Sequence, residues 1–203
     1  MIAILNYGMG NLGSMANMFR YLGIDAVITS SPDVLADASH LILPGVGSFD
    51  AAMEKLASQT DLIPMLTDLV MNKGLPTLGV CLGMQLLLES SEEGASQGLG
   101  WIQGRVRKFA SSQTLKVPHM GWNDAQVASK GCRLTKGLPE TTRYYFVHSF
   151  YAEPAEPSSV MFRTEYGAKF ASGVFKDNVF GVQFHPEKSH RFGMALLKNF
   201  ASL

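Results

Sequence analysis

Short apolar runs alternate with segments of helical periodicity through the first half of the chain. The runs predicted as strands are residues 2–5, 26–28, 40–43 and 77–80. The segments predicted as helices are residues 12–22, 49–56, 62–71 and 84–89. Such alternation is typical of βαβ units with right-handed crossovers, in which helices cover the faces of a parallel sheet. The pattern therefore predicts the α/β class.

From Trp101 onward, closely spaced strand-like runs replace this alternation. They include residues 143–150, 170–175 and 179–184, with a turn at 176–178. Residues 191–200 return to helical spacing and predict a closing helix. We expect a mostly parallel central sheet with an antiparallel or mixed extension in the second half. No internal repeat or linker divides the chain, so we expect one domain over residues 1–203.

The amino-acid composition disfavours several classes of protein and of binding partner. Apolar residues make up 46% of the chain, and basic and acidic residues number 17 each, which disfavours both a disordered chain and a nucleic-acid partner. No apolar run approaches the roughly 20 residues that a membrane helix needs, and the N-terminus lacks the pattern of an export signal. We expect a soluble cytoplasmic protein. Cys81 and Cys132 belong to no cluster with metal-ligand spacing, so we expect no metal and no cofactor.

Cys81 lies between two glycines at the junction of a predicted strand and a predicted helix. The sequence around it, TLGVCLGMQ, has the form of a nucleophile elbow, in which Gly79 and Gly83 leave room for a sharp turn. N–H groups at the start of the following helix would stabilise a thiolate, the attacking species. The alternative is a buried, inert cysteine, a role that free cysteines often have. Cys132 lacks this context and is expected to be inert.

His185 is the candidate general base, since it ends an apolar strand at the carboxyl edge where α/β sheets carry their sites. Pro186 stops further strand pairing, so His185 and Glu187 can turn to the same side of a bend, where the carboxylate would orient the imidazole. The alternative is that Glu187 only favours the start of the last helix. The sequence leaves His148 evenly divided between a pocket residue and a hydrogen-bonded sheet residue.

The segment LPGVGSF, residues 43–49, is a candidate for an oxyanion site. Gly45 and Gly47 allow the backbone to approach a ligand closely, and the N–H of Leu82 would be a second donor. The alternative is an ordinary glycine-rich βα turn. Neither a dinucleotide fingerprint nor a Walker loop is present, so phosphate binding is not favoured.

Together, the motifs PGVGSF, GVCLGMQ and HPEKS resemble those of class I glutamine amidotransferases. The resemblance implies a flavodoxin-like fold, a glutamyl thioester on Cys81, proton transfer by His185 and orientation of that imidazole by Glu187. The substrate would be L-glutamine. With the oxyanion donors included, the expected glutamine-binding residues are Gly45, Gly47, Leu82, Gln85, Glu93, Ser149 and Phe150.

Within that class, the segments KVPHMGWN, YFVHS and NYGMGNL are similar to those of the glutaminase subunits of imidazole glycerol phosphate synthases. The resemblance implies a heterodimer in which ammonia passes to a (β/α)₈-barrel cyclase that makes imidazole glycerol phosphate and AICAR in histidine biosynthesis. We expect Met120, Trp122 and Asn123, in a turn bounded by Gly and Pro, to contact the partner. The alternative for this segment is a hairpin that packs in the core.

Other functions stay open at this point. The same chemistry could supply a sugar amidotransferase in surface polysaccharide synthesis. A Cys-His-Glu peptidase acting alone would use the same triad, and a regulatory subunit could keep the fold without activity. Two positions depart from the family pattern, since Phe150 replaces a frequent Tyr and Asn6 a frequent Asp.

Overall fold

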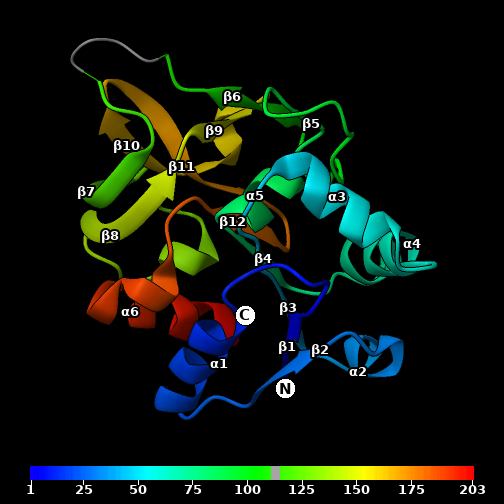
Figure 1. The fold of residues 1–203 in the computed structure, drawn as a ribbon. Helices are drawn as coiled ribbons and strands as arrows, with labels where there is room; N and C mark the ends of the chain where they lie inside the picture. Colours follow the sequence, from blue (N-terminus) through cyan, green and yellow to red (C-terminus); the bar gives the residue numbers. More distant parts are fainter. Residues whose placement is uncertain (111–114) are drawn as a thin grey trace.

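A computed structural model describes residues 1–110 and 115–203, whose strands form one 12-stranded mixed sheet (Figure 1). The parallel part, in spatial order, is β2 (Ala26–Thr29), β1 (Ile2–Leu5), β3 (His40–Leu43), β4 (Thr77–Val80) and β12 (Val179–Val182). The antiparallel part continues through β11 (Ala168–Lys176), β10 (Val160–Tyr166), β7 (His119–Val127) and β8 (Thr141–His148). Off this path lie β9 (Phe150–Pro154), β6 (Gly104–Lys108) and β5 (Ser90–Ser91).

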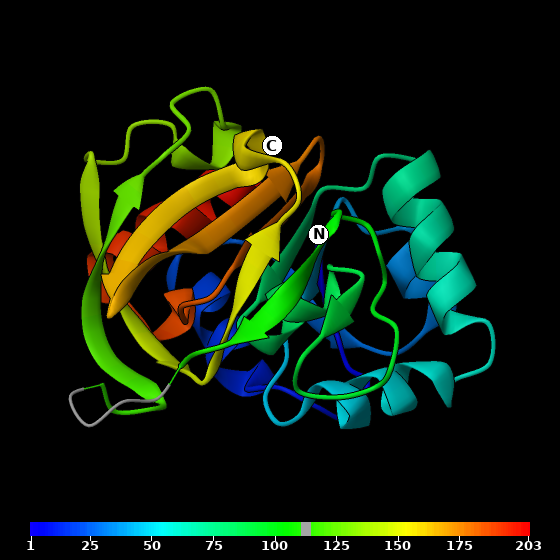
Figure 2. The same cartoon turned by 90° about the horizontal axis from the view of Figure 1, so that it is seen from above.

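Helices cover both faces of the parallel part, with α1 and α6 on one side and α3 and α4 on the other (Figures 1 and 2). The α-helices are α1 (Leu12–Tyr21), α2 (Pro32–Ala36), α3 (Phe49–Ala57), α4 (Leu62–Thr67), α5 (Leu82–Leu86) and α6 (His190–Ala201). A π-helical turn, η1 (Asp68–Asn72), continues α4, and the 3₁₀ turns are η2 (Arg133–Thr135), η3 (Pro157–Ser159) and η4 (Pro186–Lys188). Within residues 1–110 and 115–203, no helix is long and apolar enough to cross a membrane.

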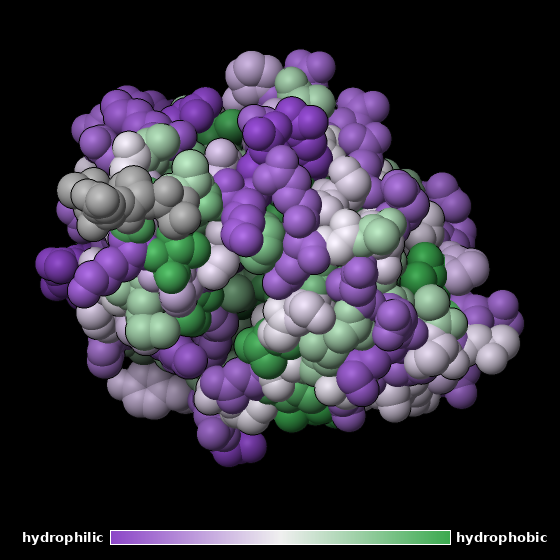
Figure 3. Space-filling view, turned by 45° about the horizontal axis from the view of Figure 1, so that its top comes forward, coloured by the Kyte–Doolittle hydropathy of each residue, from purple (hydrophilic) through white to green (hydrophobic). Residues whose placement is uncertain are grey.

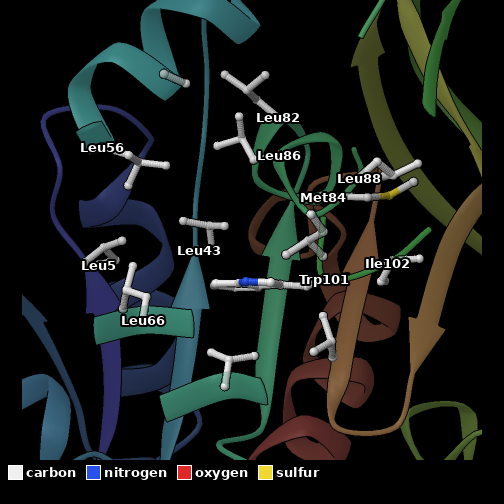
Figure 4. Packing of buried hydrophobic residues seen from close by; sticks show 14 of the residues in the cluster. Leu5, Leu43, Leu56, Leu66, Leu82, Met84, Leu86, Leu88, Trp101 and Ile102 are labelled. Carbon is white, nitrogen blue, oxygen red and sulfur yellow. The ribbon is translucent and has the colours of Figure 1, made fainter. Parts of the chain in front are cut away.

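Two apolar cores form because side chains alternate across the sheet. Along β1, Ile2 and Ile4 pack with residues of α1 and α6, whereas Ala3 and Leu5 pack with residues of α3 and α4. The second core also holds Trp101, which lies among leucines of β3, α4 and α5 (Figure 4). Burying each large apolar side chain contributes about 1.5–3 kcal/mol, so a strand buried on both faces is firmly fixed between the layers.

The predicted α/β class and the mostly parallel sheet with an antiparallel extension are confirmed. Several local predictions differ from the structure. The strand predicted over residues 179–184 ends at Val182, and the helix predicted over residues 84–89 is α5, which spans Leu82–Leu86. Helix α2 was not predicted, because its only fully buried residue is Leu35 and one residue gives no periodicity. Met120 and Trp122 were expected in a turn, which is wrong: both lie inside β7, where Gly121 is tolerated because the strand pairs along its length with β8.

Candidate active site

The site forms where β4 and β12 end side by side. Val80 and Val182 are paired in parallel register, and the N–H of Cys81 donates to the carbonyl of Val182 over 2.8 Å. The backbone N–H of His185 donates to the carbonyl of Tyr145 on β8 over 2.9 Å. These backbone bonds bring the three chain segments together at the carboxyl edge of the sheet.

Cys81 has a backbone conformation that L-residues rarely adopt, with φ 56° and ψ −112°. A residue held in such a conformation costs on the order of 1–3 kcal/mol. The turn also depends on both flanking glycines. A Cβ on Gly79 would lie 2.6 Å from the carbonyl oxygen of Gly83, and a Cβ on Gly83 would collide with the carbonyl oxygen of Leu43. The sharp turn expected from the G-x-C-x-G pattern is therefore present.

Cys81 is only 7% exposed, and polar groups lie near its thiol. Nε2 of Gln183 donates towards Sγ over 3.7 Å, and the carbonyl of Val147 lies 3.9 Å from Sγ. Gln183 is fully buried, and its Oε1 accepts from Nε2 of Gln85 over 3.1 Å. Gln183 was not predicted as a site residue, although a polar residue inside the apolar run GVQF is a usable sign of a site.

His185 and Glu187 form a buried pair beside this thiol. Nδ1 of His185 lies 2.8 Å from Oε1 of Glu187, and both side chains are at most 4% exposed. Burial lowers the pKa of His185, but hydrogen bonding and charge from Cys81 and Glu187 outweigh it and raise that pKa to about 10. Nε2 of His185 makes no hydrogen bond of ordinary geometry to the described residues. The arrangement favours a protonated imidazole beside the sulfur, with the Nε2 proton available for transfer.

Ser189, the last residue of the HPEKS motif, and Gly193, which lies beyond it, hold the histidine turn in place. The hydroxyl of Ser189 donates to the carbonyl of His185 over 2.6 Å and accepts from the N–H of Tyr145 over 3.0 Å. In α6, Gly193 packs so closely on the carbonyl of Pro186 that a Cβ would collide with it. A glycine inside a helical pattern is a sequence sign of such a close approach, but Gly193 was not predicted to support the site.

A pocket of about 360 Å³ opens above the thiol. Its lining residues are Val46, Gly47, Cys81, Leu82, Gln85, Glu93, Pro118, Val147, His148, Ser149, Phe150 and His185. It thus brings together six of the seven residues predicted to bind glutamine. The seventh, Gly45, is buried behind the pocket, where a Cβ would lie 2.8 Å from the backbone N of Gly83. Figure 3 shows the molecule with the top of Figure 1 turned forward, and a hollow with apolar atoms lies near the centre of that face.

Glu93 reaches the pocket from the loop that follows β5. Its Oε2 accepts the N–H of Phe49, at the start of α3, over 2.9 Å. Partial burial raises the pKa of Glu93, the hydrogen bond from Phe49 lowers it, and the nearby Asp50 carboxylate raises it further. Asp50 in turn accepts the N–H groups of Ala95 and Ser96, which fixes the loop.

The glycine-rich loop after β3 forms another wall. Gly47 has φ +110°, a conformation that favours glycine, and Val46 is 44% exposed. The loop therefore presents backbone to the pocket with little side-chain obstruction. The oxyanion role expected for this loop stays a prediction.

The three residues predicted to contact a partner do not share one face of β7. Met120 and Trp122 are 62% and 42% exposed, and Trp122 stacks on His190 with ring centroids 5.3 Å apart. Asn123 is half-buried on the opposite face, where its side chain donates to the carbonyl of Glu165 over 3.0 Å. Only Met120 and Trp122 are therefore presented outward.

His148 and Cys132 are the remaining candidate residues from the sequence. His148 lies in β8 and also lines the pocket, so both of its expected roles describe its position. Cys132 is buried, with Sγ 3.4 Å from the sulfur of Met161, and burial raises the pKa of its thiol. Within the described part of the chain, no group of three or more His, Cys, Asp or Glu side chains is arranged to hold a metal ion.

Comparisons with known proteins agree with this geometry. Residues 3–202 match the family model of class-I glutamine amidotransferases. HisH 2, a subunit of imidazole glycerol phosphate synthase from Methanococcus maripaludis, is 50% identical over 98% of this chain and 98% of that protein. HisH of Leptospira interrogans is 48% identical over the full length of both chains.

Solved structures show the same fold at low sequence identity. The structure of PurLQS from Thermotoga maritima has a TM-score of 0.78 and 19% identity, and the match covers 99% of this chain and 97% of that one. A crystal structure of a glutamine amidotransferase has a TM-score of 0.73 and 21% identity, over 100% and 99% of the two chains. The family model and the full-length relatives place the chain more closely: it belongs to the class I glutamine amidotransferases and, among them, to the HisH subunits of imidazole glycerol phosphate synthase.

Proposed function

We propose that this chain hydrolyses L-glutamine to glutamate and ammonia and delivers the ammonia to a cyclase subunit in histidine biosynthesis. The observation that carries the chemistry is the buried Cys81–His185–Glu187 arrangement, in which the thiol and the carboxylate both raise the pKa of the imidazole. A pocket that opens onto the same sulfur has room for a small amino acid.

In the first half of the reaction, the Cys81 thiolate attacks the side-chain amide carbon of glutamine. Negative charge moves to the amide oxygen, where N–H groups of Leu82 and of the glycine-rich loop stabilise it. When the tetrahedral intermediate collapses, the C–N bond breaks and His185 gives its Nε2 proton to the leaving nitrogen. Ammonia and a glutamyl thioester result.

In the second half, water attacks the thioester and neutral His185 takes one of its protons. The C–S bond then breaks, which releases glutamate and returns the thiolate and the imidazolium. Glu187 keeps the imidazole oriented and stabilises its positive form in both halves. Glu93 and the backbone of Ser149 and Phe150 would bind the α-amino and α-carboxyl ends of the substrate.

The partner in this proposal is a (β/α)₈-barrel cyclase that forms a heterodimer with the chain and uses ammonia to make imidazole glycerol phosphate and AICAR. Met120 and Trp122 of β7 would contact it, since exposed Met and Trp side chains are enriched at interface cores. We also propose that the cyclase raises the glutaminase rate, because the exposed loop 46–48 can change its backbone orientation when a partner covers it.

The test is glutamate release by the purified chain and by its Cys81→Ala variant, each with and without a cyclase subunit and its phosphoribulosyl substrate. The proposal requires release that depends on Cys81 and rises with the cyclase, while the variant complex still makes product from added ammonia. Glutamate release that requires Cys81 but does not change when the cyclase is added would instead favour a sugar amidotransferase as partner. Peptide cleavage by the isolated chain would overturn the glutaminase assignment.

A further inference from the structure

A chain of hydrogen bonds runs from Asn123 on β7 to the carbonyl of Phe150 in the pocket wall. Nδ2 of Asn123 lies 3.1 Å from Nε2 of His119, and Nδ1 of His119 lies 2.9 Å from Nε2 of His148. Nδ1 of His148 lies 2.7 Å from the carbonyl oxygen of Phe150. The two histidines meet because His119 and His148 are directly paired residues of β7 and β8.

The groups at the two ends of this hydrogen-bond chain fix the donor and the acceptor of every bond in it. A carbonyl oxygen only accepts, so Nδ1 of His148 carries a proton. An Asn Nδ2 only donates, and its Oδ1 accepts the N–H of Asp124 over 2.8 Å, so Nε2 of His119 is an acceptor. Nδ1 of His119 is then the proton-bearing atom that donates to Nε2 of His148. Both imidazoles are fixed as neutral Nδ1–H tautomers.

The surroundings of the pair favour neutral rings. His119 is 3% exposed and is stacked between Tyr166 and Phe146, with ring centroids 4.0 and 4.8 Å away. Burial lowers the pKa of His119 to about 4. The pKa of His148 is lowered to about 3, mainly by burial. The hydrogen bond to Phe150 raises this pKa, and electrostatic interaction with His119 and His185 lowers it.

The hydrogen-bond chain ends at Phe150, which belongs to a wall of the glutamine pocket. The carbonyl of Phe150 also accepts from Nε2 of Gln85 over 3.3 Å, and the carbonyl of Ser149 accepts the N–H of Phe109 over 3.1 Å. Residues 147–150 all line the pocket. The corner between β8 and β9 is thus held from several sides, and the bond from His148 is the shortest of these three.

We infer that His119 and His148 are positioning residues, which fix the Ser149–Phe150 wall of the pocket through a directional chain of neutral imidazoles anchored at Asn123. This inference rests on the proposed glutaminase function. Neither ring acts as an acid or a base in the reaction. Their loss is expected to affect KM for glutamine more than kcat, since the wall contacts substrate but not the reacting atoms.

The experiment compares two substitutions at His119 in the assembled complex with the cyclase. His119→Phe keeps the aromatic stacking but removes both hydrogen bonds. His119→Asn keeps a donor near the position of Nδ1 and restores the bond to His148. We expect KM for glutamine to rise about tenfold in His119→Phe with kcat within about twofold, and to return to within about threefold in His119→Asn. His40→Asn, on a distant strand, is the control histidine and is expected to leave both constants unchanged.

Each result decides between positioning and a merely structural role. An unchanged KM in His119→Phe, or an equal rise in both variants, would overturn the inference. A second measurement needs no variant: nitrogen NMR of the imidazoles in the full chain at neutral pH is expected to show protonated Nδ1 and bare Nε2 on both rings. The opposite tautomer or a charged ring would also overturn it. If the wild-type complex releases no glutamate at all, the proposed function fails, while the tautomer test still stands.

Discussion

Nδ1 of His185 lies 2.8 Å from Oε1 of Glu187, although only Pro186 separates the two residues in the chain. Strand β12 has already ended at Val182, and η4 turns the carboxylate back onto the imidazole, so this contact is a property of the local turn. It does not by itself bring the pair to the thiol. That depends on the neighbouring strand.

Replacing Glu187 by Gln tests the charge of this pair while keeping an acceptor oxygen. The carboxylate is one of two groups that raise the pKa of His185 to about 10, so that pKa is expected to fall in Glu187→Gln. A less stabilised imidazolium is also expected to lower glutamine-dependent turnover by at least about tenfold. NMR titration of the imidazole and steady-state kinetics measure the two effects. The exposed Glu140→Gln variant is the control, and an unchanged His185 pKa in Glu187→Gln would contradict the electrostatic account.

Replacing Gly83 by Ala tests the close approach behind the nucleophile. A Cβ there would collide with the carbonyl of Leu43, and backbone cannot move aside as a flexible side chain can. We expect a loss of about 3 kcal/mol or more in the free energy of unfolding, measured with urea. Gly13→Ala is the matched control: its Cβ would meet nothing within 4 Å, and alanine in helix α1 is expected to stabilise the protein by about 0.5–1 kcal/mol. Equal effects at both positions would refute the packing argument.

The conformation of Cys81 makes a further prediction about stability. At φ 56° a side chain is strained and glycine is not, so Cys81→Gly is expected to be more stable than Cys81→Ala by about 1 kcal/mol. At an ordinary helix or strand position the order is reversed. Urea unfolding of the two inactive variants gives the answer, and a more stable Cys81→Ala would mean that the turn relaxes.

The exposed face of β7 gives a prediction about assembly. Trp122→Ala is expected to weaken binding to the cyclase by about 2 kcal/mol, roughly 30-fold in Kd, since buried Trp residues are frequent hot spots. Met120→Ala is expected to weaken it less. Met71, 42% exposed in η1, provides the control Met71→Ala. Calorimetry of the two chains measures Kd, and equal affinity of wild type and Trp122→Ala would remove β7 from the proposed interface.

Much of the fold and of the site could be predicted from local patterns. The strands that end in Val80 and Val182 are mostly apolar, with only Thr77 polar, because a strand covered on both faces by helices needs no polar side. Gly79 and Gly83 marked the sharp turn at Cys81, and Pro186 marked the bend at His185. Each of these features depends on residues close together in the chain, which is why the sequence alone carried them.

Other parts of the site left only a weak sign in the sequence, because their contacts join residues far apart in the chain. Gln183 looked like one polar residue in an apolar strand, and its contact with Cys81 appears only once β12 lies beside β4. Gly193 lies in a predicted helix, and its close contact with Pro186 is visible only once α6 is placed in the fold. Met120 and Trp122 were assigned to a turn because the sequence of β7 alone does not show that it pairs with β8.

The sequence by itself determined the α/β alternation, the three motifs and the local turns that shape them. Only the tertiary structure decided that Cys81 and His185 share one pocket, and that His119 faces His148 across two paired strands. The physical reason is that strand order and register are set by non-local backbone hydrogen bonds and by the burial of whole faces of the sheet. Periodicity along one segment records which side is buried, but not which partner covers it.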